Sequence, residues 1–230
     1  MSPKLSILVP IYNEWKTVQE LLDRVLELKF EKEILVVDDG STDGTREILD
    51  RIHHPSIRIF RHPANRGKGS AIRTALANST GDIVIIQDAD LEQDPNDIYE
   101  LVKPIMTQGA QVVYGSRFLG QRPKMHWAAY AANVFLSRFT SFLYGAEITD
   151  LETCYKVFSA ELIKNIPLTC RGFEFEPEVT AKILRKGIKI YEVPIKEDWY
   201  HGYYNNSKKV TWWDGAKAIL TLIQYRFRNE

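Results

Sequence analysis

The chain has 230 residues, of which 44% are hydrophobic, so it can build one substantial core or at most two small domains. Its 30 basic and 30 acidic residues balance, which argues against a nucleic-acid partner, because such proteins usually carry a basic stripe. Cys154 and Cys170 form no CxxC pair and have no histidine at zinc spacing, a pattern typical of free thiols in a reducing compartment.

The first residues lead directly into an apolar run and carry no features of a secretory signal. No stretch long enough to span a bilayer, about 18 residues, is free of charge. The sequence therefore predicts a cytoplasmic protein without a membrane-spanning helix.

Apolar runs and helical spacing alternate through the first half of the chain. Strands are predicted at 5–9, 33–38, 57–60, 82–86 and 111–114, and Pro10 is expected to stop the first. Helices are predicted over Val18 to Leu26, with Asn13 as cap, then from Asp43, over 67–78 and from Pro95. This alternation favours an α/β fold, a doubly wound and mostly parallel sheet flanked by helices.

The alternation stops after residue 115. Long helices are predicted over 126–144, 173–186 and 209–226, and a strand over 188–193, ended by Pro194. The chain contains no internal repeat, low-complexity tract or linker, so we expect a single domain over residues 1–230.

Two carboxylates, Asp88 and Asp90, follow the strand predicted at 82–86, with the small Ala89 between them. Open α/β sheets bind ligands at the carboxyl edge of their strands. Carboxylates held together repel each other, and either a shared proton or a divalent cation relieves that repulsion. Because Mg²⁺ and Mn²⁺ prefer oxygen ligands and bring phosphates with them, the pair predicts a metal–diphosphate site.

Polar residues also follow the other early strands. Asp39 is a candidate acceptor for a base N–H or a ribose hydroxyl, and Pro10 and Tyr12 are candidates for backbone contacts and stacking. Taken singly, Asp39 is equally explained as a helix cap, and the segment around Lys68 as a plain turn, since it lacks the full Walker spacing. The set at successive strand ends is what predicts a nucleotide pocket.

Several segments look like the family 2 inverting glycosyltransferases of GT-A (Rossmann-like) fold: LSILVPIYNE at 5–14, VDDGSTDGT at 37–45, NRGKG at 65–69 and DADL at 88–91. Three further segments resemble the branch that contains dolichyl-phosphate mannose synthase and bacterial polyprenyl-phosphate sugar transferases: GSRF at 115–118, DLETCYKVF at 150–158 and EVPI at 192–195. The resemblance covers nearly the whole chain.

The resemblance implies a GDP- or UDP-sugar donor, bound by residues 1–115, whose diphosphate sits on Mg²⁺ or Mn²⁺. It implies that Asp88 and Asp90 hold the metal, with Glu92 where the branch often has a third ligand, Gln. The implied donor-binding residues are Pro10, Tyr12, Glu14, Asp39, Lys68, Asp88, Ala89 and Lys208.

Residues 116–230 are expected to build the acceptor side. A lipid-phosphate acceptor is already ionised and needs no general base, and the Arg117 guanidinium is the candidate to hold it. A hydroxyl acceptor would need a carboxylate. The implied catalytic set is Asp90, Arg117, Asp150 and Glu174, with Glu152 and Glu176 as further candidate bases.

The chain departs from the branch at two places. Cys154-Tyr155-Lys156 stands where Gly, Phe and Arg are common, so Lys156 would replace a guanidinium by a point charge. The segment 199–209 contains no arginine, and the candidates to replace one there are His201, Lys208 and Lys209.

The helices predicted at 126–144 and 209–226 carry aromatic residues near basic ones, a pattern typical of interfacial helices, although packing on the core or in a homodimer explains it equally. The predicted function is metal-dependent transfer of a hexose from a nucleotide sugar to polyprenyl or dolichyl phosphate at the cytoplasmic membrane face. A same-fold transferase to a sugar or protein hydroxyl, and an inactive nucleotide-sugar-binding subunit that serves a membrane partner, are the alternatives.

Overall fold

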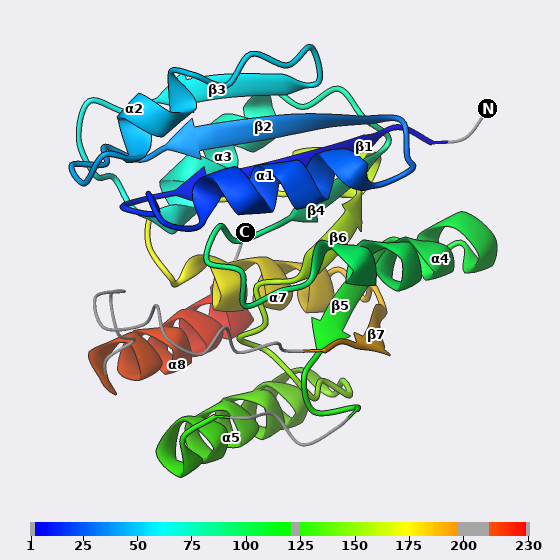
Figure 1. Ribbon diagram of the computed structural model, residues 1–230. Helices are drawn as coiled ribbons and strands as arrows, with labels where there is room; N and C mark the ends of the chain where they lie inside the picture. Colours follow the sequence, from blue (N-terminus) through cyan, green and yellow to red (C-terminus); the bar gives the residue numbers. More distant parts are fainter. Residues whose placement is uncertain (1–2, 121–124, 197–211, 229–230) are drawn as a thin grey trace.

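The computed structural model describes residues 3–120, 125–196 and 212–228. Figure 1 shows a twisted sheet with helices on both of its faces. The strands are β1 (Leu5–Ile11), β2 (Lys32–Asp38), β3 (Ile57–Arg61), β4 (Ile83–Ile86), β5 (Val112–Ser116), β6 (Lys156–Ser159) and β7 (Ile190–Pro194). The helices are α1 (Val18–Glu27), α2 (Thr45–Leu49), α3 (Lys68–Ala77), η1 (Pro95–Asp97), α4 (Ile98–Gln108), α5 (Trp127–Tyr144), α6 (Ala160–Lys164), α7 (Phe175–Arg185) and α8 (Trp212–Phe227).

The sheet has the strand order β3-β2-β1-β4-β6-β5-β7. The pairs β1–β2, β1–β4, β2–β3 and β5–β7 are parallel, and β6 is antiparallel to both β4 and β5. The prediction of a doubly wound, mostly parallel sheet is therefore confirmed. Because β6 opposes both neighbours, β4 and β5 run the same way and end at the same edge.

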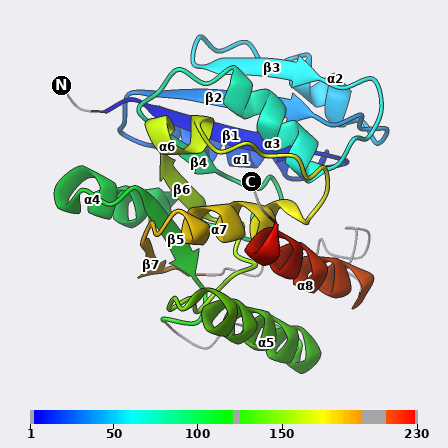
Figure 2. The ribbon, with the colours of Figure 1, turned by 180° about the vertical axis from the view of Figure 1, so that it is seen from behind.

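Each face of the sheet buries its own hydrophobic cluster. Leu8 and Leu35 point into a cluster with α3 and α7, whereas Ile7 and Val9 point into one with α1 and α4. Figure 2, seen from behind, shows α3, α6 and α7 over the first of these faces. Since successive strand residues face opposite sides, strands covered on both sides read as continuous apolar runs.

The sequence prediction that Pro10 ends the first strand is wrong, because β1 runs on to Ile11. The carbonyl of Leu8 accepts from Gln87 N on the β4 side, while that of Ile11 accepts from Asp39 N on the β2 side. By alternation, the ring nitrogen of Pro10 faces β4, beyond the last ladder pair, Leu8–Ile86. The missing N–H therefore costs no ladder hydrogen bond.

Asn13 does not cap α1, as the sequence suggested; Thr17 precedes that helix. Instead, Asn13 adopts a left-handed backbone with φ of 60°, which asparagine tolerates. Its side-chain oxygen accepts from Thr42 N and its backbone N–H donates to Ser41 Oγ, at 2.8 and 3.0 Å. Asn13 thus ties the loop after β1 to the loop after β2.

Helices α5 and α8 lie side by side at the end of the molecule farthest from β3 (Figure 1). Of the helix predicted over 209–226, residues 212–226 fall within α8, and 209–211 lie outside the described residues. Within the ranges that the structure describes, no helix is long and apolar enough to cross a bilayer.

Candidate active site

A small cleft of about 30 Å³ opens where β4 and β5 end. Its lining consists of Asp88, Asp90, Glu92, Gln93, Arg117, Thr153, Cys154 and Ile195. Four residues that the sequence singled out, Asp88, Asp90, Glu92 and Arg117, therefore meet in one cleft. Asp88, Asp90 and Glu92 follow β4 and Arg117 follows β5, and these two strands end at the same edge of the sheet.

The chain turns sharply after the Asp88–Asp90 pair. Leu91 has a φ of 64°, in the left-handed region, where a residue with a Cβ is strained by about 1–2 kcal/mol. The Leu91 side chain is buried, which offsets that cost. On either side of the turn, Asp90 Oδ1 accepts from Glu92 N at 3.0 Å and Asp88 N donates to Gln93 Oε1 at 3.3 Å.

The carboxylates in and beside this cleft repel one another. Burial, and then the charge of Asp88, raises the pKa of Asp90 above its usual value. Burial, and then the charge of Asp90, raises the pKa of Glu14, in the loop after β1, to about 7. Such mutual repulsion marks a place where a cation is stabilising.

The residues fit a divalent ion that arrives with a diphosphate. Among the described residues, no three His, Cys, Asp or Glu side chains are already arranged as a metal site. Mg²⁺ does not require such a group, because it is usually held by one or two carboxylates together with substrate phosphates and water. The all-oxygen set of Asp88, Asp90 and Glu92 meets that need.

Lys68, predicted to bind the donor, lies beneath the cleft. Its ammonium is 2.9 Å from Asp88 Oδ2, 2.9 Å from Cys154 Sγ and 3.2 Å from Glu176 Oε1. Burial alone would lower the pKa of Lys68, but Asp88, Cys154 and Glu176 raise it well above its usual value. Lys68 therefore stays charged and holds the Asp88 carboxylate in place.

Gly67 lets the start of α3 approach the segment before α7 closely. It has a φ of 94°, and a Cβ there would clash with the backbone carbonyl of Arg171. A side chain at this position would push Lys68 away from Asp88, so the glycine is required by both conformation and space.

Asp39, predicted to accept hydrogen bonds from the nucleoside, is buried and accepts hydrogen bonds from the loop before α3. Its carboxylate accepts from Gly67 N at 2.7 Å and Arg66 N at 3.0 Å, and lies 2.6 Å from His62 Nδ1. The other ring nitrogen of His62 is 2.9 Å from Thr74 Oγ1. Sequence reasoning gave His62 no role, because its partners come from other elements and share no local spacing.

The other predicted donor residues lie around the end of β1 and at the turn after β4. Pro10 is within β1, Tyr12 just beyond it is 40% exposed, and Ala89 is buried. Lys208, with His201 and Lys209, lies outside the described residues.

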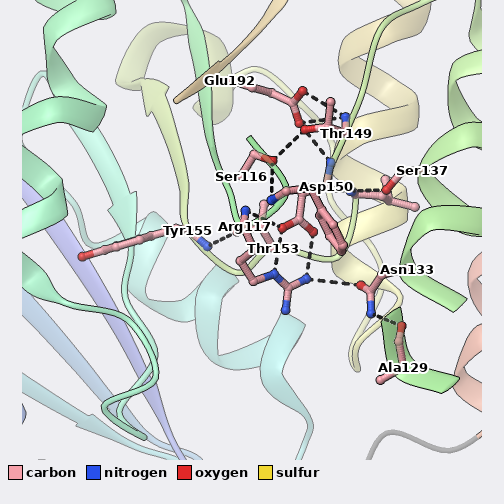
Figure 3. Close-up of polar contacts among 12 residues, drawn as sticks. Ser116, Arg117, Ala129, Asn133, Ser137, Thr149, Asp150, Thr153, Tyr155 and Glu192 are labelled. Carbon is pink, nitrogen blue, oxygen red and sulfur yellow. Dashed lines mark hydrogen bonds and ion pairs between the residues drawn. The ribbon is translucent and has the colours of Figure 1, made fainter. Parts of the chain in front are cut away.

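Arg117 is oriented by a fully buried carboxylate (Figure 3). Asp150 Oδ2 accepts from Arg117 Nε at 2.7 Å and from its backbone N at 3.0 Å, and Oδ1 accepts from Nη2 at 2.8 Å. Glu192 in turn accepts from the backbone N–H groups of Thr149 and Asp150. This bidentate geometry leaves Asp150 poorly placed to take a proton and well placed to fix the guanidinium.

The remaining candidate bases, Glu174, Glu176 and Glu152, do not line the cleft. Glu174 precedes α7 and pairs with Lys217 of α8 at 3.5 Å, and it is not part of the cleft lining. Glu176 Oε2 and Glu152 Oε1 are buried oxygens without a hydrogen-bond partner among the described residues. Burial, followed by the charge of Glu176, raises the pKa of Glu152 to about 7.

This raised pKa predicts a pH-dependent stability. Glu152 binds its proton more tightly in the folded than in the unfolded chain, so the free energy of unfolding falls as pH rises from about 4.5 to 7. Glu152→Gln should remove that cost and raise the free energy of unfolding at pH 8, by at most about 3 kcal/mol, with little effect at pH 4. Urea denaturation at both pH values measures this, with Glu100→Gln on α4 as the control. Equal midpoints at pH 8 would contradict it.

Lys156 does not offer a point charge to the cleft. It is fully buried, and its ammonium donates to the carbonyls of Leu151, at 2.9 Å, and Thr153, and lies 4.4 Å from the centre of the Tyr114 ring. Burial lowers the pKa of Lys156. The residue therefore braces the segment between Asp150 and Cys154 rather than replacing a guanidinium.

Comparisons with known proteins give the family and the fold of the chain. The model of Glycosyl transferase family 2 matches residues 6–166. The chain is 30% identical to an uncharacterized protein of Methanocaldococcus jannaschii, over 97% of this chain and 92% of that protein. It is 29% identical to the UDP-N-acetylglucosamine–dolichyl-phosphate N-acetylglucosaminyltransferase of Methanococcus voltae, over 83% of this chain and 84% of that protein.

A dolichyl-phosphate beta-glucosyltransferase of Trichomonas vaginalis is also 29% identical, over 84% of this chain and 65% of that protein. The fold matches glucosyl-3-phosphoglycerate synthase from Mycobacterium tuberculosis, solved with UDP, with a TM-score of 0.72 at 20% identity, over 99% of this chain and 82% of that one. The sheet flanked by helices is thus the GT-A fold of glycosyltransferases. The chain belongs to glycosyl transferase family 2.

Proposed function

We propose that this glycosyltransferase moves a hexose from a GDP- or UDP-sugar to a polyprenyl or dolichyl phosphate. The observation that carries the proposal is Arg117, held by Asp150 in the same cleft as Asp88 and Asp90. A guanidinium fixed at this position suits an acceptor phosphate opposite the donor diphosphate. The dolichyl-phosphate transferases among the relatives support the same class of acceptor.

We further propose that residues 1–115 bind the donor and residues 116–230 bind the acceptor within a single domain. Asp88, Asp90 and Glu92 would hold Mg²⁺ or Mn²⁺. When bound, the ion would offset the negative charge that develops on the nucleoside diphosphate as it leaves. Structures of the Mycobacterium tuberculosis synthase that contain UDP with Mg²⁺ or Mn²⁺ support this choice of metals.

The chemistry needs no general base if the acceptor is a phosphate. An acceptor phosphate oxygen forms the new bond to the anomeric carbon, with inversion, while the bond from that carbon to the diphosphate breaks. The attacking oxygen is already ionised near neutral pH, so no proton has to be removed. The protein's part is orientation: Lys68 holds Asp88, and Asp150 holds Arg117.

We propose that α5 and α8 rest on the cytoplasmic face of a membrane, where a lipid phosphate is found. Both helices expose large apolar side chains, among them Phe135, Phe142, Trp213, Leu220 and Phe227. On α5, Phe135 and Phe142 line an open groove together with Arg138. Aromatic and aliphatic residues near a basic side chain suit the headgroup region of a bilayer.

The triple variant Phe135→Ser, Phe142→Ser and Leu220→Ser tests this contact. Each apolar side chain moved out of water contributes about 1.5–3 kcal/mol, so the partition coefficient onto anionic vesicles should fall at least about 100-fold. Sedimentation with sucrose-loaded vesicles measures it, and Met106→Ser, an exposed apolar residue on α4, is the control. An unchanged partition coefficient would rule out this surface.

The test of the activity is incubation of the protein with labelled GDP- and UDP-sugars, MgCl₂ or MnCl₂, and polyprenyl phosphate in detergent. The proposal expects label in an acid-labile lipid fraction with at least one donor. Label only on a soluble sugar or protein acceptor would identify a hydroxyl as the acceptor instead. No transfer and no donor hydrolysis with any sugar would support the inactive-subunit alternative.

A further inference from the structure

Helix α5 carries a polar stripe on the side that faces the active site. Its members, Asn133, Ser137 and Ser141, are spaced by four residues and so lie on one side of the helix. Ser137 Oγ accepts from Leu151 N at 3.0 Å, and Ser141 Oγ accepts from Ile148 N, also at 3.0 Å. The stripe therefore binds the segment that contains Asp150 at two points.

The third member, Asn133, contacts the guanidinium of Arg117. Asn133 Oδ1 accepts from Arg117 Nη2 at 3.2 Å, on a different side from Asp150, as Figure 3 shows. Asn133 Nδ2 donates to the carbonyl of Ala129 at 2.8 Å. That bond within the helix fixes which way the amide points, so its oxygen is presented to Arg117.

We propose that Asn133 is a positioning residue that fixes Arg117 from α5, so that the phosphate-holding group and the lipid-facing helix are joined directly. The inference rests on the proposed function, in which Arg117 holds the acceptor phosphate. Asp150 sets the plane of the guanidinium through Nε and Nη2, and Asn133 adds a second anchor on Nη2. Being neutral, the amide adds this anchor without cancelling the positive charge that a phosphate needs.

The contact between Asn133 and Arg117 links the acceptor-binding group to the surface of α5. The same helix presents Val134, Phe135 and Phe142 to the open groove. A lipid chain that binds in this groove and fixes the position of α5 therefore also fixes the position of Arg117, the group proposed to bind the phosphate.

The decisive variant is Asn133→Leu, which keeps the size of the side chain and removes its hydrogen bonds. Thr140→Val is the matched control, because the Thr140 hydroxyl donates to the Leu136 carbonyl within α5. For Asn133→Leu we expect the KM for polyprenyl phosphate to rise about 10-fold or more, the fold-change for losing one charge-assisted hydrogen bond, with the donor KM unchanged. We expect Thr140→Val to match the wild type in both constants.

A second readout does not depend on turnover. In ¹⁵N spectra, the Arg117 Nη2 hydrogens, for which Asn133 is an acceptor, should exchange with water several-fold faster in Asn133→Leu than in wild type or Thr140→Val. If exchange is faster in Asn133→Leu but the wild-type protein does not transfer sugar to polyprenyl phosphate, the proposed acceptor is wrong and the positioning of Arg117 by Asn133 is supported. Unchanged exchange, or equal increases in the donor and acceptor KM, would overturn the role of Asn133.

Discussion

Replacing Asp90 by alanine should lower kcat for sugar transfer about 1000-fold, the scale of losing one electrostatic group that stabilises a developing charge. Asp90 lines the cleft, and burial and Asp88 raise its pKa. The ionised carboxylate is therefore destabilised, and a bound cation would stabilise it. Chelation of divalent ions should lower transfer by the wild-type protein to a similar extent, and added Mg²⁺ or Mn²⁺ should restore it.

The control is Asp82→Asn. Asp82 immediately precedes β4 and accepts from Lys4 N, so it lies at the opposite end of the strand from Asp90. This variant should keep the wild-type kcat and the wild-type dependence on metal concentration. Transfer by Asp90→Ala at a rate near that of the wild type, or transfer that chelators leave intact, would remove the metal from the proposed mechanism.

The position of Asp88 and Asp90 in the cleft was predictable because its signals are local. The run of four apolar residues in β4 followed by Asp88 and Asp90 places both carboxylates at the sheet edge in any parallel sheet. Arg117 follows β5 in the same way, and it lines the same cleft because β4 and β5 run in one direction.

The missed features depend on contacts between distant segments. Strand β6 has only four residues, and its pairing with β4 and β5 has no local signature. The amide of Asn133 and the ammonium of Lys68 acquire their roles from partners 16 and 20 residues away, in elements whose relative placement only the fold defines. Residue type alone suggested that Asp150 could be a base; its three hydrogen bonds from Arg117 indicate that it orients the arginine.

Arg117→Lys should raise the KM for the lipid-phosphate acceptor about 30-fold while changing the donor KM less than about 3-fold. The reason is geometric: lysine keeps the charge but loses the planar fork that bonds Asp150 and a phosphate together, and such charge-assisted bonds are worth about 1.5–3 kcal/mol. Lysine is preferred to alanine, because removing the cation would leave the fully buried Asp150 unpaired, at a cost of about 3–5 kcal/mol to the fold.

Arg58→Lys is the matched control for this second prediction. Arg58 also pairs with a mostly buried carboxylate, Glu33, at 2.7 Å, but Glu33 lies at the opposite end of β2 from Asp38, away from the cleft. Both variants lose an arginine–carboxylate pair, so a general effect on stability would appear in both. A rise confined to the acceptor KM of Arg117→Lys assigns the guanidinium to the acceptor phosphate; an equal rise in the donor KM would move Arg117 to the donor diphosphate, and the acceptor would then need another cation.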